Sequence, residues 1–108
     1  MKEEIVKNMC GGEGEVRIKR LLNENQLNGK CGLFAQVTIA PGSSLGYHTH
    51  HNESETYYIL SGEGEYDDNG NKRVVKAGDV TFTPNGCGHG MKTLGDEPIV
   101  FMALIIFD

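Results

Sequence analysis

The sequence lacks several features by which large classes of protein are recognised. No run of apolar residues is long enough to cross a membrane, and residues 1–10 contain no apolar segment typical of a secretory signal. Lysine and arginine form no basic cluster, and the formal net charge is −5. Because an acidic chain repels phosphate groups, we expect neither nucleic acid nor a membrane surface among its partners.

Cysteine is scarce and shows no paired spacing. The chain contains three cysteines, Cys10, Cys31 and Cys87, and no CxxC motif. An odd number without paired spacing argues against a disulfide framework and against a thiolate zinc cluster. We therefore expect free thiols and a cytoplasmic location, where thiols stay reduced.

Several catalytic motifs are also missing. The sequence has no Ser-His-Asp order, no pair of catalytic carboxylates and no glycine-lysine loop that would cradle a phosphate. A Gly-Glu-Gly-Glu stretch occurs at residues 12–15 and again at 62–65, but neither copy extends to GxGxxG. A dinucleotide-binding loop is therefore not predicted, and we interpret both stretches as turns.

Glycine and short β-forming runs are abundant. Fifteen of the 108 residues are glycine, and the apolar runs are rich in Val, Ile, Thr, Tyr and Phe and end at Gly, Pro or Asn. This pattern predicts a single all-β domain. We expect a helical turn at residues 24–28 and a tight hairpin turn at Asn69-Gly70. The predicted strands cover residues 16–22, 33–39, 46–50, 56–60, 63–66, 73–76, 80–83, 88–93 and 99–107.

The most informative pattern joins histidines to one glutamate. His48 and His50 are separated by one residue, Thr49, so in a strand their side chains share a face. Glu55 follows a short polar loop at residues 52–54, and this order brings its carboxylate back over the two rings. A second block, Gly78-x5-Pro84-x-Gly86-x2-His89, supplies a third imidazole from a separate hairpin.

Such a donor set is typical of a transition-metal site. Histidine nitrogen and carboxylate oxygen bind Mn, Fe, Co, Ni, Cu or Zn at about 2.0–2.2 Å. The alternative is that the histidines are hydrogen-bonded core residues, but their joint spacing with Glu55 argues against it. Four protein ligands on a six-coordinate ion leave two positions for water, substrate or dioxygen. The sequence therefore predicts an open metal site and does not specify the metal.

The two blocks resemble those of the cupin superfamily, in particular a small single-domain cupin. The resemblance covers residues 42–93, about half of the chain, and its motifs agree in spacing and in residue type. It implies an antiparallel double-stranded β-helix, that is, a jelly-roll barrel. The metal would be held inside the barrel by His48, His50, Glu55 and His89.

The resemblance also implies a division of the single domain, residues 1–108. Residues 1–15 would form an N-terminal arm, residues 38–93 would carry the two motifs, and residues 99–107 would form the last strand. The family's second block often closes with Asn, and Thr93 stands there in this chain. A contact beyond the metal ligands is therefore expected to differ.

Four further residues are candidates to line the pocket. Tyr57 shares the face of Glu55, either as a hydrogen-bond donor in the cavity or as a packed barrel residue. Met91 shares the face of His89 and would supply apolar wall, and Thr93 follows on the same strand. Strand alternation turns either Gln36 and Thr38 or their neighbours inward, so Gln36 is the fourth candidate.

Three residues close to the ligands are expected to play lesser roles. His51 is predicted to be a solvated loop residue. Glu53 is predicted to be a surface charge, with a place at the entrance of the pocket as the alternative. Cys87 lies between two glycines, which favours a thiol in a turn over a thiol facing the pocket.

Three functions remain open at this point. The first is a metalloenzyme acting on a small carboxylate, hydroxyl-bearing or sugar-like molecule, since related cupins include dioxygenases, decarboxylases, isomerases and lyases. The second is a non-catalytic module that binds or senses a small ligand. The third is a structural barrel without metal, against which the four-ligand pattern argues. Fold alone does not decide between an enzyme and a binding module.

The last predicted strand is apolar on both faces. Val100, Met102, Leu104 and Ile106 would face one side, and the residues between them would face the other. Because monomers seldom expose large apolar surfaces, we expect a homodimer to cover part of this strand. Complete burial within one chain is the alternative.

Overall fold

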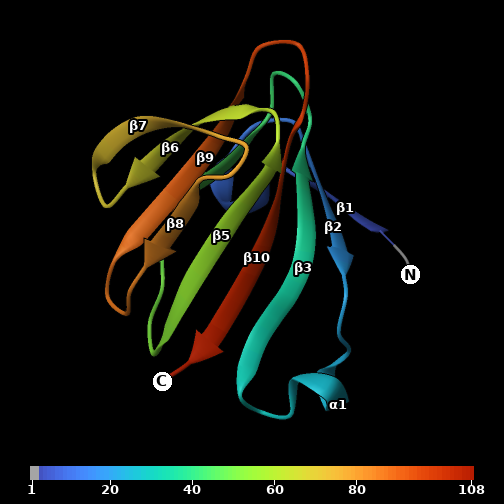
Figure 1. The fold of residues 1–108 in the computed structure, drawn as a ribbon, viewed down its shortest axis with the longest axis vertical. Coiled ribbons are helices and arrows are strands. Elements are labelled where there is room, and N and C mark those ends of the chain that lie inside the picture. The colour runs from blue at the N-terminus through green and yellow to red at the C-terminus, as the bar shows by residue number, and fades with distance from the viewer. Residues whose placement is uncertain (1–2) are drawn as a thin grey trace.

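A computed structural model describes residues 3–108 as two antiparallel sheets that close into a jelly-roll barrel (Figure 1). The larger sheet has six strands in the order β1-β2-β3-β10-β5-β8, and the smaller has four in the order β4-β9-β6-β7. The all-β prediction is confirmed. The strands are β1 (Glu3–Lys7), β2 (Glu15–Arg20), β3 (Cys31–Ile39), β4 (Ser44–Thr49), β5 (Glu53–Ser61), β6 (Glu63–Asp68), β7 (Asn71–Lys76), β8 (Val80–Thr83), β9 (Gly88–Leu94) and β10 (Ile99–Phe107).

Each of the nine strands predicted from the sequence is present, with ends that differ by at most a few residues. The predicted helical turn is α1 (Glu24–Leu27), which Asn23 caps through a reciprocal pair of hydrogen bonds with Gln26. The β6–β7 hairpin turns at Asn69 and Gly70, whose φ angles of 51° and 97° are those that a tight primed turn requires.

The strand β1 was not predicted. Its residues are charged at both ends and, apart from the half-buried Val6, exposed, so no alternating apolar pattern indicates a strand. Pairing with β2 along its whole length, from Glu3 opposite Lys19 to Lys7 opposite Glu15, holds it at the sheet edge. The segment expected to be an arm therefore contributes a strand and a short 3-10 helix, η1 (Met9–Gly11), that contacts β4.

The core lies between the two sheets, where alternate residues of facing strands are fully buried. On β10 the inward residues are Ile99, Phe101 and Ala103, which the smaller sheet covers. The opposite face of β10 points out of the barrel and is partly exposed. Among the described residues, no helix is long and apolar enough to cross a membrane.

Candidate metal centre

Three imidazoles and one carboxylate converge at one end of the barrel. His48 and His89 come from the four-stranded sheet, His50 follows directly after β4, and Glu55 comes from β5 of the six-stranded sheet. One donor atom from each of these residues lies within 4.8 Å of the donor atoms of the others. The four residues that the sequence singled out as ligands are therefore brought together across both sheets.

The first block positions its histidines through strand alternation. Tyr47 and Thr49 are exposed, whereas His48 is half-buried and His50 is buried, so the two histidines share the inner face. The chain then reverses at His51 and Asn52, and Asn52 takes a left-handed φ of 62°. Because β5 begins at Glu53, the reversal is shorter than the expected loop at residues 52–54, and Glu55 lies inside the strand.

The second block brings its histidine alongside the first. His89 on β9 lies directly opposite His48 on β4 in the antiparallel register. The turn between β8 and β9 also pairs with the backbone of His50. The amide of His50 donates to the carbonyl of Cys87 over 3.0 Å, and the amide of Gly86 donates to the carbonyl of His50 over 2.8 Å. The glycine-rich turn therefore fixes His50 as well as His89.

The spacing of the donor atoms fits a metal ion with two open positions. The His89 Nε2 atom lies 3.0 Å from His50 Nε2, 3.1 Å from His48 Nε2 and 3.0 Å from Glu55 Oε1. The distance from His50 Nε2 to Glu55 Oε1 is also 3.0 Å. Ligands about 2.1 Å from an ion are about 3.0 Å apart at right angles and about 3.4 Å apart in a tetrahedron. The distances therefore match neighbouring corners of an octahedron.

The ring nitrogens on the far side of each imidazole are all engaged. His48 Nδ1 donates to the carbonyl of Gly46 over 2.7 Å, and His50 Nδ1 lies 2.5 Å from a carboxylate oxygen of Glu53. Both partners are acceptors, so in the neutral form of each ring Nδ1 carries the proton and Nε2 keeps its lone pair. His89 Nδ1 lies 2.8 Å from the Tyr66 hydroxyl and 2.9 Å from the Thr83 hydroxyl. This is how proteins orient histidine ligands toward a metal.

The charges of the site also suit a cation. Burial lowers the pKa of His48, and the neighbouring histidines lower it further, which favours the neutral ring. Burial opposes ionisation of Glu55, but hydrogen bonds with His50 and His89 outweigh it and lower the pKa of Glu55 to about 2. Hydrogen bonding to Glu55, and then to Glu53, raises the pKa of His50, so a metal would compete with a proton for this ring. The centre therefore presents an ionised carboxylate that attracts positive charge.

The four other pocket candidates differ in where their side chains lie. Tyr57 is buried, and its hydroxyl lies 3.3 Å from His89 Nε2, so it reaches the centre. Met91 is buried in the core, where it packs against Gly64, and the Thr93 hydroxyl donates to the carbonyl of Ile39 over 2.7 Å. Gln36 lies on the outer face of β3, because its neighbours Ala35 and Val37 are buried in the core. Its proposed place in the pocket is therefore wrong.

Glu53 is the functional residue that the sequence analysis undervalued. It was expected to be a surface charge, yet its side chain is 23% exposed and holds the Nδ1 atom of His50. The signal was the spacing of three residues between His50 and Glu53 across a tight reversal. His51, in contrast, is exposed in the loop as expected, and Cys87 is a free cysteine in the turn before β9.

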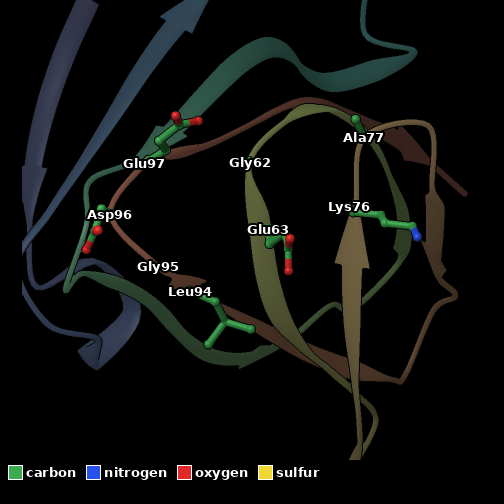
Figure 2. Close-up of a pocket in the computed structure, with 8 residues that line it drawn as sticks. All are labelled: Gly62, Glu63, Lys76, Ala77, Leu94, Gly95, Asp96 and Glu97. Atoms are coloured by element: carbon green, nitrogen blue, oxygen red, sulfur yellow. The ribbon is translucent and has the colours of Figure 1, made fainter.

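A hollow lies at the opposite end of the barrel, with a volume of about 510 Å³ (Figure 2). Its walls include Glu63 and Lys76 on paired strands and Asp96 and Glu97 in the turn between β9 and β10. Along β6 it begins five residues from the position opposite His89, roughly 17 Å away. The carboxylates of Glu63, Asp96 and Glu97 do not converge on one point (Figure 2). We therefore treat this hollow as separate from the candidate centre.

Comparison with known proteins agrees with this geometry. A family model described as "Cupin domain" matches residues 35–107. The chain is 46% identical over 103 residues to an "Oxalate-binding protein" of Thermotoga maritima. The alignment covers 95% of this chain and 85% of that protein. A crystal structure described as a predicted oxalate decarboxylase from Thermotoga maritima superposes with a TM-score of 0.97 at 44% identity, over 100% of this chain and 94% of that one.

A more distant relative is the oxalate decarboxylase of Bacillus subtilis. The identity is 36% over 75 residues, which is 65% of this chain but 20% of that protein. The chain therefore corresponds to about a fifth of the length of the decarboxylase, which limits what the match says about activity.

Proposed function

The chain belongs to the cupin family, and from that premise we propose that it binds a divalent transition metal at His48, His50, Glu55 and His89 and, through the metal, a small carboxylate such as oxalate. The observation that carries the proposal is the convergence of three Nε2 atoms and one carboxylate oxygen within 4.8 Å. The oxalate-binding relative, which shares 46% of aligned residues, supports the choice of ligand class.

The chain's own residues would divide the work as follows. The three imidazoles and Glu55 would hold the metal, and Gly46, Glu53, Tyr66 and Thr83 would keep the rings in place through their Nδ1 atoms. A bound metal with two open positions would supply a Lewis-acidic centre for carboxylate oxygens. The metal itself is not specified by this donor set, and Mn, Fe, Co, Ni, Cu and Zn all remain compatible.

Metal and oxalate titrations of protein without an affinity tag test this proposal. We expect the metal-free wild type to bind about one equivalent of Mn(II) or Co(II), and the loaded protein to bind oxalate. His48→Ala should abolish both, whereas His51→Ala, which alters the exposed neighbouring histidine, should leave both unchanged. A wild-type protein that takes up less than about a tenth of an equivalent of every transition metal would favour a structural barrel without metal.

Turnover of the bound carboxylate is a second candidate function, favoured by the match to an oxalate decarboxylase. Decarboxylation of oxalate consumes a proton and yields formate and carbon dioxide. Incubation of the metal-loaded protein with oxalate, followed by assay for formate, distinguishes the two. Formate production that is lost in His48→Ala supports an enzyme, and tight oxalate binding with no formate under any metal supports a binding module.

A second copy of the chain is the proposed partner at the outer face of the six-stranded sheet. Apolar side chains gather there on neighbouring strands: Tyr58 and Leu60 on β5, Ile106 on β10, and Val80 and Phe82 on β8 are between 40% and 59% exposed. Monomers seldom leave such a surface uncovered.

The cytoplasmic location remains a prediction.

Sedimentation over a range of concentrations tests the dimer. We expect the wild type to sediment as a dimer and Phe82→Asp to sediment as a monomer. Val74→Asp is the matched control, because Val74 is 58% exposed on β7 of the other sheet. A wild type that stays monomeric at every concentration contradicts this part of the proposal.

A further inference from the structure

The buried hydroxyl of Tyr57 reaches the candidate centre without being one of the four ligands. Tyr57 is 2% exposed and lies on β5, two residues beyond Glu55 and on the same inner face. Its ring stacks on the imidazole of His89, with centroids 4.8 Å apart and planes 22° apart, and it packs against Phe101 at 4.3 Å. These contacts fix the ring, and the hydroxyl is directed at the Nε2 atom of His89 over 3.3 Å.

That hydrogen-bond partner is shared with the proposed metal. The same Nε2 atom lies 3.0–3.1 Å from His48, His50 and Glu55, the other three donors. Once a metal takes the lone pair of Nε2, the hydroxyl of Tyr57 can no longer donate to it. A buried hydroxyl group without an acceptor is unfavourable, so another acceptor is expected. One candidate is the carboxylate of Glu55: burial raises the pKa of Tyr57, and the charge and hydrogen bond of Glu55 raise it further. The other would be an oxygen atom of a ligand in the open positions.

The interior of the described residues offers a bound anion few other hydrogen-bond donors. No lysine or arginine is buried among residues 3–108, so neither residue type is available there to recognise an anion. The other buried hydroxyls beside His89, those of Tyr66 and Thr83, are hydrogen-bonded to each other and to Nδ1 on the far side of the ring. Tyr57 is therefore the hydroxyl donor on the side where the four ligand atoms converge.

We propose that the Tyr57 hydroxyl donates a hydrogen bond to a carboxylate oxygen of the small anion bound at the metal centre, and so acts as a specificity-determining residue. The inference rests on the proposed function. It assigns Tyr57 to recognition of the anion and not to holding the metal. Tyr66 has the opposite role, because its hydroxyl contacts Nδ1 of His89 and supports a metal ligand.

Two single variants with opposite expected effects, Tyr57→Phe and Tyr66→Phe, test this assignment. For Tyr57→Phe we expect oxalate binding to the Co(II)-loaded protein to weaken by about 10- to 100-fold, as for loss of a hydrogen bond to a charged group. Its Co(II) affinity and its Co(II) absorption spectrum without oxalate should match those of the wild type. Tyr66→Phe should weaken Co(II) binding, while its loaded form binds oxalate as the wild type does.

Three results would overturn the assignment. If Tyr57→Phe binds oxalate with unchanged affinity, the hydroxyl does not contact the anion. If its Co(II) affinity falls and its spectrum changes before oxalate is added, Tyr57 acts by orienting Glu55 or His89. A wild type that binds Co(II) but no oxalate overturns the role of Tyr57 and leaves the metal site standing. A wild type that binds no metal removes the proposed function itself.

Discussion

The two ends of the barrel differ in how their polar side chains are held. At the metal-centre end, four donor atoms from both sheets lie within 4.8 Å, and each imidazole has a partner on its other nitrogen. At the opposite end, a hollow of about 510 Å³ is lined by Glu63, Asp96, Glu97 and Lys76, whose carboxylates do not converge (Figure 2). The number of carboxylates alone would favour the hollow as a cation site, whereas convergence of buried donors favours the centre.

The difference follows from where each end obtains its side chains. The centre is built on paired strands, with His48 opposite His89 and Glu55 opposite Thr83, so the backbone ladder fixes these donors. The hollow takes Asp96 and Glu97 from an exposed turn that lies outside the strands. A site on rigid elements holds its ligands at the distances that a metal requires.

The largest expected contrast comes from changing one polar side chain at each end of the barrel. His48→Ala should lower Mn(II) affinity by at least about 100-fold, because a direct ligand is lost, and Glu63→Gln should leave it unchanged. Competition against a chelating dye measures both. A comparable loss in Glu63→Gln would mean that the metal binds at the hollow and that the contrast between the ends is wrong.

Two glycines offer a contrast in stability. A Cβ atom on Gly46 would overlap the carbonyl oxygen of Cys10 in η1, and one on Gly62 would overlap that of Pro98. Each alanine variant should lower the free energy of unfolding by about 2 kcal/mol, measured by urea denaturation of the metal-free protein. Metal affinity should fall in Gly46→Ala alone, because the carbonyl of Gly46 holds His48 Nδ1. Equal metal affinities in the two variants would show that this carbonyl does not position the ring.

Glu53 tests the partner of a single imidazole. Glu53→Gln keeps a hydrogen-bond acceptor for His50 Nδ1 but removes the charge, so we expect Mn(II) affinity to fall by about 10-fold. Glu97→Gln, at the opposite end, is the control for loss of one negative charge. Equal affinities in these two variants would return Glu53 to the role of a surface charge, which is how the sequence analysis interpreted it.

The smallest expected effect concerns the hydroxyls behind His89. Tyr66 and Thr83 both lie within 2.9 Å of His89 Nδ1, so either hydroxyl can replace the other. We therefore expect Thr83→Val to lower metal affinity by only about 3-fold, and to lower it further when combined with Tyr66→Phe. Effects that simply add, with no extra loss in the double variant, would contradict this shared role.

Local patterns in the sequence predicted the strands and the proposed ligands well. Alternation indicates that His48 and His50 share a face, and the Asn69-Gly70 turn requires angles that these residues adopt readily. Pairing across the chain was harder to predict. The strand β1 is stabilised by its partner and carries no apolar face, and the inward side of β3 was undecided because Gln36 and Val37 alternate with no other clue.

The contacts behind the ligands were also beyond the sequence. Glu53, Tyr66 and Thr83 reach the imidazoles only because a tight reversal and two strand pairings place them there. Spacing along the chain reveals which residues share a strand face, but it does not reveal which residue of a facing strand lies behind a ring. The partner of an imidazole is therefore visible in the structure and not in the motif.

A crystal structure of the protein loaded with Co(II) or Mn(II), with anomalous differences recorded at the metal edge, tests the central claim most directly. The account predicts one peak about 2.0–2.2 Å from the Nε2 atoms of His48, His50 and His89 and from a carboxylate oxygen of Glu55. A peak in the hollow beside Glu63, or no peak among the three imidazoles in a protein that has taken up the metal, would contradict it.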